Sequence, residues 1–296
     1  MTMTVAELEQ EIRDRINHPR KQHFLLRSSA DWNKLCSALD VIGDTELALD
    51  AYLEHPAVEN VGLRYLFVYG AFQLLQTQQD AVAHLCSALG IASTNSPKLP
   101  HICDVRSAAV AHPASRAENR ASKSGFIQRI SLSHHGFTLM TVYSDGKPYD
   151  FKKVHIPMLI KEQRDVLLQV LREVVTKLDE EDMAHKEKHQ GEKLSAAFPP
   201  TLGYYFEKIR EAARDATYYP LGKMHVELVK ESLERFKQAL ESRGEWRAHV
   251  GVSYAYEELE YPLESLLLFF TDRASSRLNE KDACIFSWFV QSELKE

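Results

Sequence analysis

Apolar residues recur at intervals of three and four positions over most of the chain, the spacing that places them on one face of an α-helix. The pattern predicts a first helix over Val5 to Ile16, ended by His18-Pro19, and a long amphipathic helix over Met158 to His189. Further helices are predicted over 201–216, 220–242, 262–276 and 280–294. Since no apolar run approaches the ~20 residues that span a bilayer, we expect a mainly α protein that has no membrane partner.

Helices are also expected between Ser29 and Leu75. The helical pattern that begins near Ser29 meets Gly43-Asp44, which predicts a break, with Asp44 as the N-cap of the helix that resumes. The run from Val61 to Leu75 is apolar at most positions. Such a run predicts a central core helix that is buried on most of its sides.

The following segment carries several helix-ending signals. The polar stretch from Gln76 to Asp80 predicts a break, and Gly90 predicts the C-cap of the helix after it. Pro100 suits the first turn of a short helix. That helix should end at His112, because the residue before Pro113 is disfavoured in helical geometry.

The pattern changes to a strand-like alternation between Gly125 and Pro157. It predicts a hairpin around His134-His135-Gly136, then a turn at 144–148 and a third short strand through Tyr149 to Val154. A sheet this small needs a helix to cover it. We therefore expect a helical bundle with a small antiparallel β-hairpin insertion and a C-terminal helical extension.

Composition and charge limit the class of protein, its cellular compartment and its possible partners. The chain has 296 residues, 44% of them hydrophobic and 26% charged, as in a globular protein of one large or two ordinary domains. The segment from Met1 to Gln10 lacks the pattern of a secretory signal, which predicts a cytoplasmic protein. Four scattered cysteines are expected to be reduced core thiols. A formal net charge of −6 argues against non-specific coating of nucleic acid, which needs a broad basic face, so any RNA contact is expected to be local.

Three regions are expected along the chain. They are an N-terminal helix over 1–28, a helical domain over 29–195 with the β insertion at 125–157, and a C-terminal helical region over 196–296. Phe198-Pro199-Pro200 is the candidate boundary between the last two, because two consecutive prolines cannot continue a helix.

The short helix predicted over Pro100 to His112 carries the candidate chemistry. Arg106 offers a fixed positive fork that suits a phosphate. His112 can exchange a proton near neutral pH without a metal ion. The spacing alone is weak evidence, since Arg13 with His18 or Arg243 with His249 also match it. Six residues of α-helix rotate by about 240°, so one regular helix would not place both side chains on one face.

The order of these elements resembles the HEPN superfamily of small α-helical domains, many of which are ribonucleases. The resemblance covers roughly 29–178 and rests on three segments. They are Gly43-Asp44-Thr45-Glu46-Leu47-Ala48-Leu49, Tyr65-Leu66-Phe67-Val68-Tyr69, and Asp104-Val105-Arg106 with His112. It implies that the helix over 158–189 is the last of the bundle and that the hairpin is an insertion.

The resemblance implies a metal-independent endoribonuclease with Arg106 and His112 as its catalytic pair and no cofactor. A symmetric homodimer would bring two such helices around one RNA phosphate, and cleavage would leave a 2′,3′-cyclic phosphate. Ser107 stands where the family most often has Asn. Ala114 stands where members modified by a nucleotidyltransferase antitoxin have Tyr, so that partner is not supported. A toxin or phage-defence role, with another antitoxin or regulatory protein as partner, follows from the resemblance alone.

Other residues could support this site. Asp104 and Glu46 are candidate supporting polar residues, and Glu46 could orient a basic side chain at the site. The simpler interpretation is that Asp104 is exposed or caps the helix, and that Glu46 is a surface residue in a first helical turn. Arg116, Arg120 and Lys123 form a modest basic loop that could bind flanking RNA phosphates, or simply be solvated.

Two histidine pairs offer metal chemistry only weakly. His134-His135 lacks a third ligand nearby, and His185 with His189 is expected on an exposed charged face, so no metal site is predicted. A non-catalytic helical binding or scaffold protein on the same bundle remains the alternative function. In that case Arg106 would pair with a carboxylate, and His112 would only cap the helix end.

Overall fold

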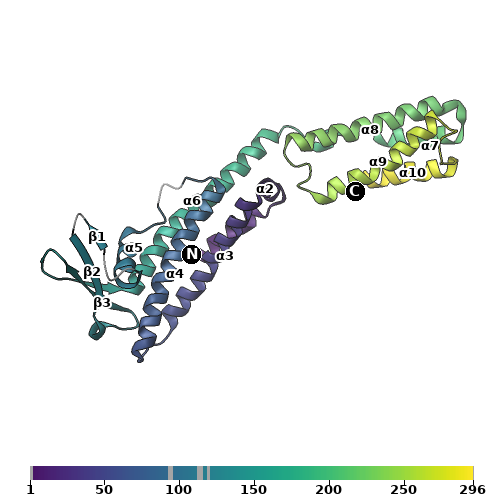
Figure 1. Cartoon of the computed structure of the whole chain (residues 1–296). Helices are drawn as coiled ribbons and strands as arrows, with labels where there is room; N and C mark the ends of the chain where they lie inside the picture. Colours follow the sequence, from purple (N-terminus) through teal and green to yellow (C-terminus); the bar gives the residue numbers. More distant parts are fainter. Residues whose placement is uncertain (1–2, 93–95, 112–115, 119–120, 296) are drawn as a thin grey trace. The chain divides into compact units, whose positions relative to one another are not determined.

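The computed structural model describes residues 3–92, 96–111, 116–118 and 121–295. They form a mainly helical chain with one small antiparallel sheet, which confirms the predicted fold class at this level (Figure 1). Within the described residues, no helix has the length and apolar character needed to cross a bilayer. The four cysteines are free thiols, and Cys86 is buried as predicted, whereas Cys36, Cys103 and Cys284 are only half-buried.

The chain divides into two compact units, each with its own core. The first unit contains residues 1–17 and 25–181, and the second contains residues 18–24 and 182–296. The helix α6, Ile156–His189, contributes its residues up to Glu181 to the first unit and the remainder to the second.

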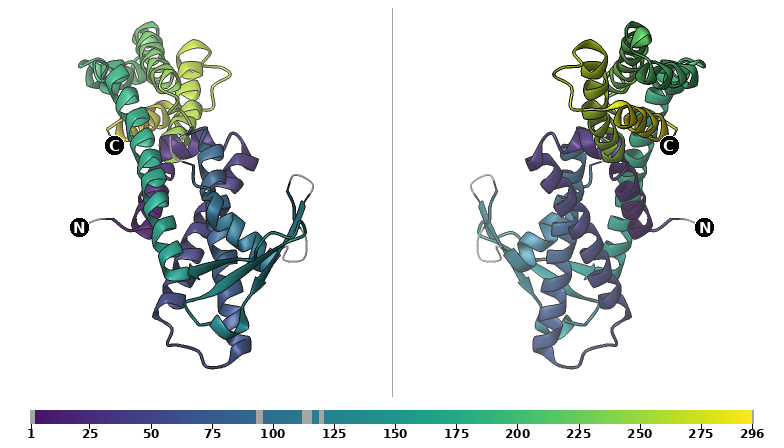
Figure 2. Two further views of the ribbon diagram at one scale, coloured as in Figure 1. Left: turned by 90° about the vertical axis from the view of Figure 1, so that its left-hand side faces the viewer. Right: turned by 90° about the vertical axis from the view of Figure 1, so that its right-hand side faces the viewer.

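The first unit is built on α1 (Val5–Ile16), α3 (Ser29–Glu54), α4 (Val61–Leu89) and α6. The predicted first helix is confirmed, and a capping box between Thr4 and Glu7 fixes its start. The helices α3 and α4 lie side by side in both views of Figure 2. Their apolar stripes meet those of α1 and α6 in one core, which includes Leu8, Ile12, Leu39, Leu85 and Leu171.

The break predicted at Gly43-Asp44 is wrong, because α3 continues through both residues. Buried residues on either side of Gly43, such as Ile42 and Leu49, keep one apolar stripe against the core. The free energy of burying that stripe outweighs the roughly 1 kcal/mol that a glycine costs inside a helix.

Two expectations for α4 are also wrong. The predicted break over 76–80 lies within the continuous helix, which ends as expected at Gly90 in the left-handed conformation. The stretch from Val61 to Leu75 is not buried on most sides, since Leu66 is 67% exposed and Tyr69 is also exposed.

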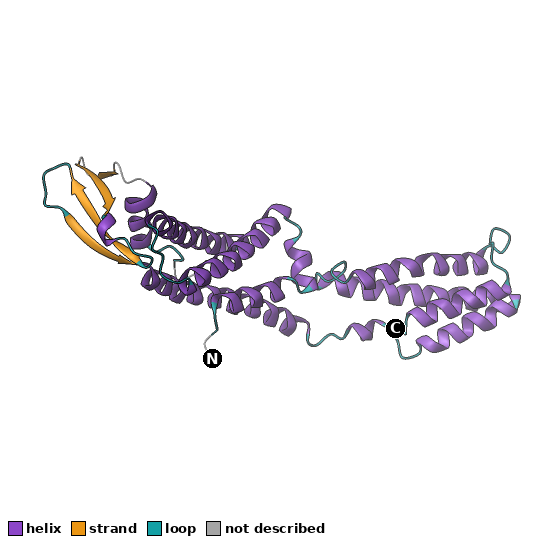
Figure 3. Cartoon of the chain, turned by 90° about the horizontal axis from the view of Figure 1, so that it is seen from below, coloured by secondary structure: helices purple, strands orange, loops and turns teal. Residues whose placement is uncertain are grey.

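The sheet has four antiparallel strands in the order β1 (Arg116–Glu118), β2 (Ala121–Ile127), β3 (Gly136–Tyr143) and β4 (Asp150–His155). The hairpin and third strand are thus confirmed, with the addition of β1 and a 3₁₀ turn at Arg129–Ser131. One face packs on α4 and α5 (Pro100–Arg106) through Phe137, Leu139 and Val154. Figure 3 shows the strands beside the helices at one end of this unit.

The second unit contains α2 (Pro19–Leu25), α7 (Leu202–Arg214), α8 (Tyr219–Ser242), α9 (Val250–Thr271) and α10 (Glu280–Glu293), with 3₁₀ turns at Leu194–Ala197 and Ala216–Tyr218. Leu25, the last residue of α2, belongs to the first unit. The core of the second unit is rich in aromatic residues and includes Phe206, Phe269 and Phe270.

The start predicted for a helix at Pro262 is wrong, because α9 begins at Val250 and contains Pro262 in its interior. Proline usually breaks a helix by removing one hydrogen bond. Here Pro262 is itself buried, between Leu259 and Leu266 on the same apolar stripe. Core packing therefore holds the helix across a residue that favours a break.

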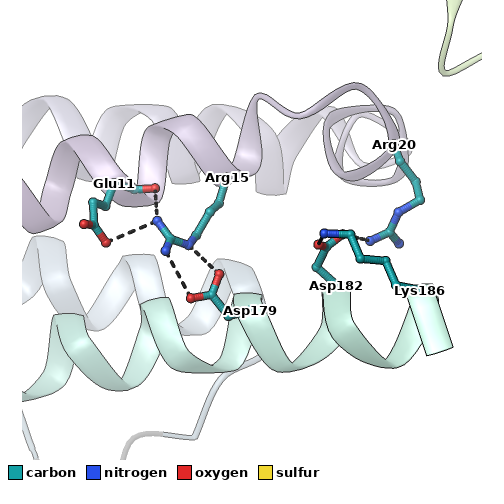
Figure 4. Close-up of polar contacts among 6 residues, drawn as sticks. All are labelled: Glu11, Arg15, Arg20, Asp179, Asp182 and Lys186. Carbon is teal, nitrogen blue, oxygen red and sulfur yellow. Dashed lines mark hydrogen bonds and ion pairs between the residues drawn. The ribbon is translucent and has the colours of Figure 1, made fainter.

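Ion pairs reinforce α6 in both units (Figure 4). In the first unit, Arg15 of α1 pairs with Asp179 at 2.7 Å and with Glu11 at 3.2 Å. In the second unit, Asp182 accepts from both Arg20 and Lys186, at 3.2 and 2.6 Å. Arg15 thus ties α1 to the part of α6 in the first unit, and Arg20 ties α2 to the part of α6 in the second unit.

Candidate functional site

The helix α5 begins at Pro100 as predicted, but its α-helical part ends at Arg106. The next five residues, Ser107–Ala111, form a π-helix, whose wider turn rotates less per residue than an α-helix does. The rotation calculated for a regular helix therefore does not apply here. Gly125 of β2 packs closely against this turn. A Cβ at that position would overlap the carbonyl oxygen of Ala108, so this close approach requires glycine.

Arg106 lies half-buried at the junction of the α- and π-helical segments. One terminal guanidinium nitrogen donates to Oε1 of Gln73 on α4 at 3.0 Å. Its Nε is buried and has no hydrogen-bond partner among the described residues. Among the described residues, the contact that holds Arg106 is thus a neutral amide and not the carboxylate of the alternative interpretation.

The other predicted residues on this helix differ in how they are placed. The Ser107 hydroxyl donates back to the carbonyl oxygen of Cys103 at 2.8 Å, so its hydrogen is used within the helix. Asp104 has an exposed side chain, as expected. His112 lies outside the described residues, and so does its geometry relative to Arg106.

The basic segment predicted as a loop is folded into strands. Arg116 of β1 pairs in backbone register with Lys123 of β2, and the two strands run antiparallel. Arg120 lies outside the described residues. The loop prediction is wrong because this segment extends the hairpin that begins at Gly125.

Glu46 lies in the interior of α3, not in a first helical turn as predicted. It is 6% exposed, accepts from Nε2 of Gln78 at 2.6 Å and forms an ion pair with Arg164 of α6 at 3.0 Å. Arg164 also donates to Asp50 at 2.6 Å. Burial raises the pKa of Glu46, against the lowering effects of Gln78 and Arg164. Glu46 orients a basic side chain, and that side chain is Arg164.

A chain of glutamine side chains extends inward from Glu46. Gln78 accepts from Gln163 of α6 at 2.6 Å, and Gln163 accepts from Gln79 at 2.6 Å. Gln163 also donates to the carbonyl oxygen of Leu75 at 3.2 Å. All three glutamines are fully buried. Their hydrogen bonds satisfy polar groups that would be costly to bury alone.

The chain of glutamines reaches the helix that carries Arg106. Gln79 accepts from the backbone N–H of Leu99 at 3.1 Å, just before α5 begins. The Cys103 thiol lies 3.4 Å from Oε1 of Gln76 and 3.6 Å from Oε1 of Gln79. Polar contacts therefore position α5 against α4 on the turn before Arg106.

Sequence reasoning missed these glutamines because glutamine is usually a surface residue. A signal was nevertheless present in their spacing. Gln78 and Gln79 fall on the same helical stripe as Leu75 and Val82, at intervals of three and four residues. Polar residues on an apolar stripe predict a buried hydrogen-bonded network.

One histidine of each pair, His134 and His185, makes contacts within the folded chain. His134 is buried, stacks on the Tyr52 ring with centroids 4.9 Å apart, and accepts the Tyr52 hydroxyl through its carbonyl oxygen at 2.6 Å. His185 lies 3.1 Å from the carbonyl oxygen of Arg243, so it is not on an exposed face as predicted. In the described part of the chain, no three His, Cys, Asp or Glu residues are grouped as metal ligands.

Comparisons with known proteins found no matching family model, no matching curated protein and no matching solved structure.

Proposed function

We propose that this protein is a metal-independent endoribonuclease of the HEPN type, with Arg106 and His112 as its catalytic pair. The observation that carries the proposal is the environment of Arg106. Its partner among the described residues is the neutral Gln73 amide, and its Nε has none. A guanidinium that is not neutralised by a carboxylate keeps its charge for an anionic ligand such as an RNA phosphate.

The proposed reaction is an internal transesterification of RNA. The ribose 2′-oxygen attacks the adjacent phosphorus while the bond from phosphorus to the 5′-oxygen breaks. One His112 accepts the 2′-hydroxyl proton, and a second donates a proton to the leaving 5′-oxygen. Arg106 stabilises the charge that develops on the phosphoryl oxygens. The products are a 2′,3′-cyclic phosphate and a 5′-hydroxyl.

This scheme needs two copies of the helix, and α4 carries a surface that supports a homodimer. Leu66, Tyr69 and Gln73 are exposed at intervals of three and four residues, so they line one face of α4. Gln73 is the residue that binds Arg106. A second copy docked on this apolar face would come next to Arg106.

The second candidate function is a non-catalytic binding protein, and Ser107 favours it. Its hydroxyl hydrogen is engaged by the carbonyl oxygen of Cys103. It is therefore not free to donate to a phosphate as an asparagine amide would.

The test is cleavage of a labelled RNA pool in EDTA, with analysis of the product ends. Wild-type protein is expected to release 2′,3′-cyclic phosphate ends, and Arg106→Ala and His112→Ala are each expected to lower the rate at least about 100-fold. Arg106→Lys should recover only part of the loss, because lysine lacks the planar fork.

The matched controls are Arg247→Ala and His249→Ala, an exposed arginine and a half-buried histidine of the second unit. Both should cut at the wild-type rate. Circular dichroism must show the same helix content in every variant. If folded wild-type protein releases no cyclic phosphate ends, or if the Arg106 and His112 variants cut as fast as wild type, the proposed nuclease is wrong.

A further inference from the structure

The outer face of the sheet is the surface opposite the helices. In the antiparallel register, Phe126 of β2, Met140 of β3 and Phe151 of β4 lie side by side across three strands on this face. The neighbouring positions Phe137, Leu139 and Val154 point the other way, into the core with α4 and α5. The row of three apolar side chains is therefore not part of the core.

Two aromatic rings on this face are open to water. Phe126 is 48% exposed and Phe151 is 53% exposed, while Met140 between them is half-buried. Because these rings stay open to water in the folded chain, they gain none of the free energy that burial of a phenylalanine provides. Rings in this position can stack on the flat faces of other rings.

The charges around the row are positive. Lys153 lies two residues after Phe151, on the same face. No carboxylate lies on this face in β3, in β4 or in the part of β2 that begins at Lys123. At the edge of β4, a cavity of about 400 Å³ is lined by Lys152, Lys153 and Lys161, and by Val105 beside Arg106. Two carboxylates, Glu162 and Asp165, also line it, and Glu162 is paired with His101 at 3.0 Å. Among the described residues, no ion pair joins these three lysines to a carboxylate.

We infer that the outer face and the β4 edge form a binding surface for single-stranded RNA. Bases stack on Phe126 and Phe151, and phosphates bind Lys153 and the lysines of the edge cavity. Aromatic rings interleaved with lysines are the combination that single-stranded nucleic acids require, since every base has a ring face and every linkage has a charge. Paired bases cannot reach the rings, so duplex RNA is excluded.

This inference deepens the proposed function, because it names the form of RNA that would be presented to Arg106. The surface contacts that helix directly. The edge cavity is lined by His101 and Val105 of α5. An RNA strand held on β4 would thus lie next to the helix that carries the proposed catalytic arginine.

The test measures binding separately from cleavage. The probe is a fluorescent 2′-O-methyl RNA of about twelve nucleotides without self-complementarity, the length that such surfaces cover. Its blocked 2′-oxygen cannot react, so fluorescence anisotropy reports binding whether or not the protein is a nuclease. Wild-type protein is expected to bind it, and an unlabelled duplex of the same length should compete at least tenfold more weakly than the unlabelled single strand.

Removal of each aromatic ring should weaken binding by about 5- to 150-fold, the range for loss of one stacked base. Phe126→Ala and Phe151→Ala are the variants, and Phe151→Tyr should retain the affinity because it keeps the ring. Tyr261→Ala, an exposed aromatic of the second unit, is the control. Thermal unfolding should be unchanged in each variant, since these rings are outside the core.

Lys153→Gln should weaken binding and also lower the slope of log affinity against log salt by about 0.7, the value for one lost phosphate contact on a single strand. Lys153→Arg should restore the slope. Lys188→Gln, at an exposed lysine of the second unit, should leave it unchanged.

Several results would overturn the inference. One is wild-type protein that does not bind the probe up to roughly 100 µM, the weak end of non-specific binding. Another is binding that all the Phe126, Phe151 and Lys153 variants retain. A third is self-association that Phe126→Ala abolishes without any RNA binding, which would make the face a protein interface. Binding without cleavage would refute the proposed nuclease and leave this surface standing.

Discussion

Three glutamines occupy positions that apolar residues usually take in a helical core. Gln78, Gln79 and Gln163 are fully buried, and each is hydrogen-bonded to the next across α4 and α6. Glutamine carries two donors and an acceptor, so a buried one is stable only when its neighbours complement it. The three residues therefore stabilise the unit together, and the loss of one affects the others.

Gln163→Leu tests this dependence. The substitution leaves the side-chain donor of Gln79 and the side-chain acceptor of Gln78 without their partner. We expect the free energy of unfolding to fall by about 2–6 kcal/mol, because each of these two unsatisfied buried groups costs roughly 1–3 kcal/mol. Urea unfolding followed by circular dichroism measures it. Gln169→Leu, on the exposed side of the same helix, should change it by less than about 0.5 kcal/mol. Equal effects of the two substitutions would refute the network.

The raised pKa of Glu46 predicts how the stability of the first unit depends on pH. Burial raises its pKa above the ordinary 4.5, so the folded protein keeps this proton at pH values where the unfolded chain has lost it. The contribution of Glu46 to stability is therefore largest below pH 4.5, falls as pH rises to the raised pKa, and is constant above it.

Glu46→Gln has no such proton. The difference in unfolding free energy between wild type and this variant should be more favourable to wild type at pH 4.5 than at neutral pH. Urea unfolding at several pH values measures the difference. Glu54→Gln, at an exposed carboxyl on the same helix, is the control. A wild-type advantage that grows as pH rises would show that the pKa is lowered instead.

At the scale of the elements, the close packing of the sheet on the π-helix Ser107–Ala111 depends on a glycine, which has no side chain. Gly125 lets β2 approach this turn, and a Cβ there would overlap the Ala108 carbonyl oxygen. Gly43 is the opposite case, because a Cβ at its position in α3 meets nothing within 4 Å. The same substitution should therefore have opposite effects at the two sites.

Gly125→Ala should lower the free energy of unfolding by about 1–3 kcal/mol, as overpacking does, because β2 must move away from the turn. Gly43→Ala should raise it by about 0.5–1 kcal/mol, since alanine favours an unstrained helix. Thermal and urea unfolding of both variants measure the effects. If both substitutions stabilise the protein, the close approach of β2 to Ala108 is wrong.

On the scale of the whole molecule, the sequence predicts elements well where local signals and packing agree. The helices α1 and α6 and the caps at Pro100 and Gly90 follow from apolar spacing and from proline or glycine alone. It fails where packing overrides a local signal, as at Gly43 and Pro262. A break signal at one residue amounts to only about 1–3 kcal/mol, whereas an apolar stripe stabilises a helix along its whole length.

The candidate site follows the same rule. A short helix around Arg106 could be predicted from Pro100 and the apolar spacing. Its partner Gln73 could not, because a hydrogen bond between residues 33 positions apart leaves no local trace. Nor could the role of Glu46, whose partner Arg164 comes from a distant helix.

The glutamine chain also removes an ambiguity that amide side chains normally bring. A row of amides can run in two senses, with every donor and acceptor exchanged. Here one end is the Glu46 carboxylate, which only accepts when ionised, and the other is the backbone N–H of Leu99, which only donates. The reversed sense would oppose two acceptors at one end and two donors at the other. The interior of the first unit thus has a single ground state instead of two degenerate ones, and the groups that select it lie at the ends of the row.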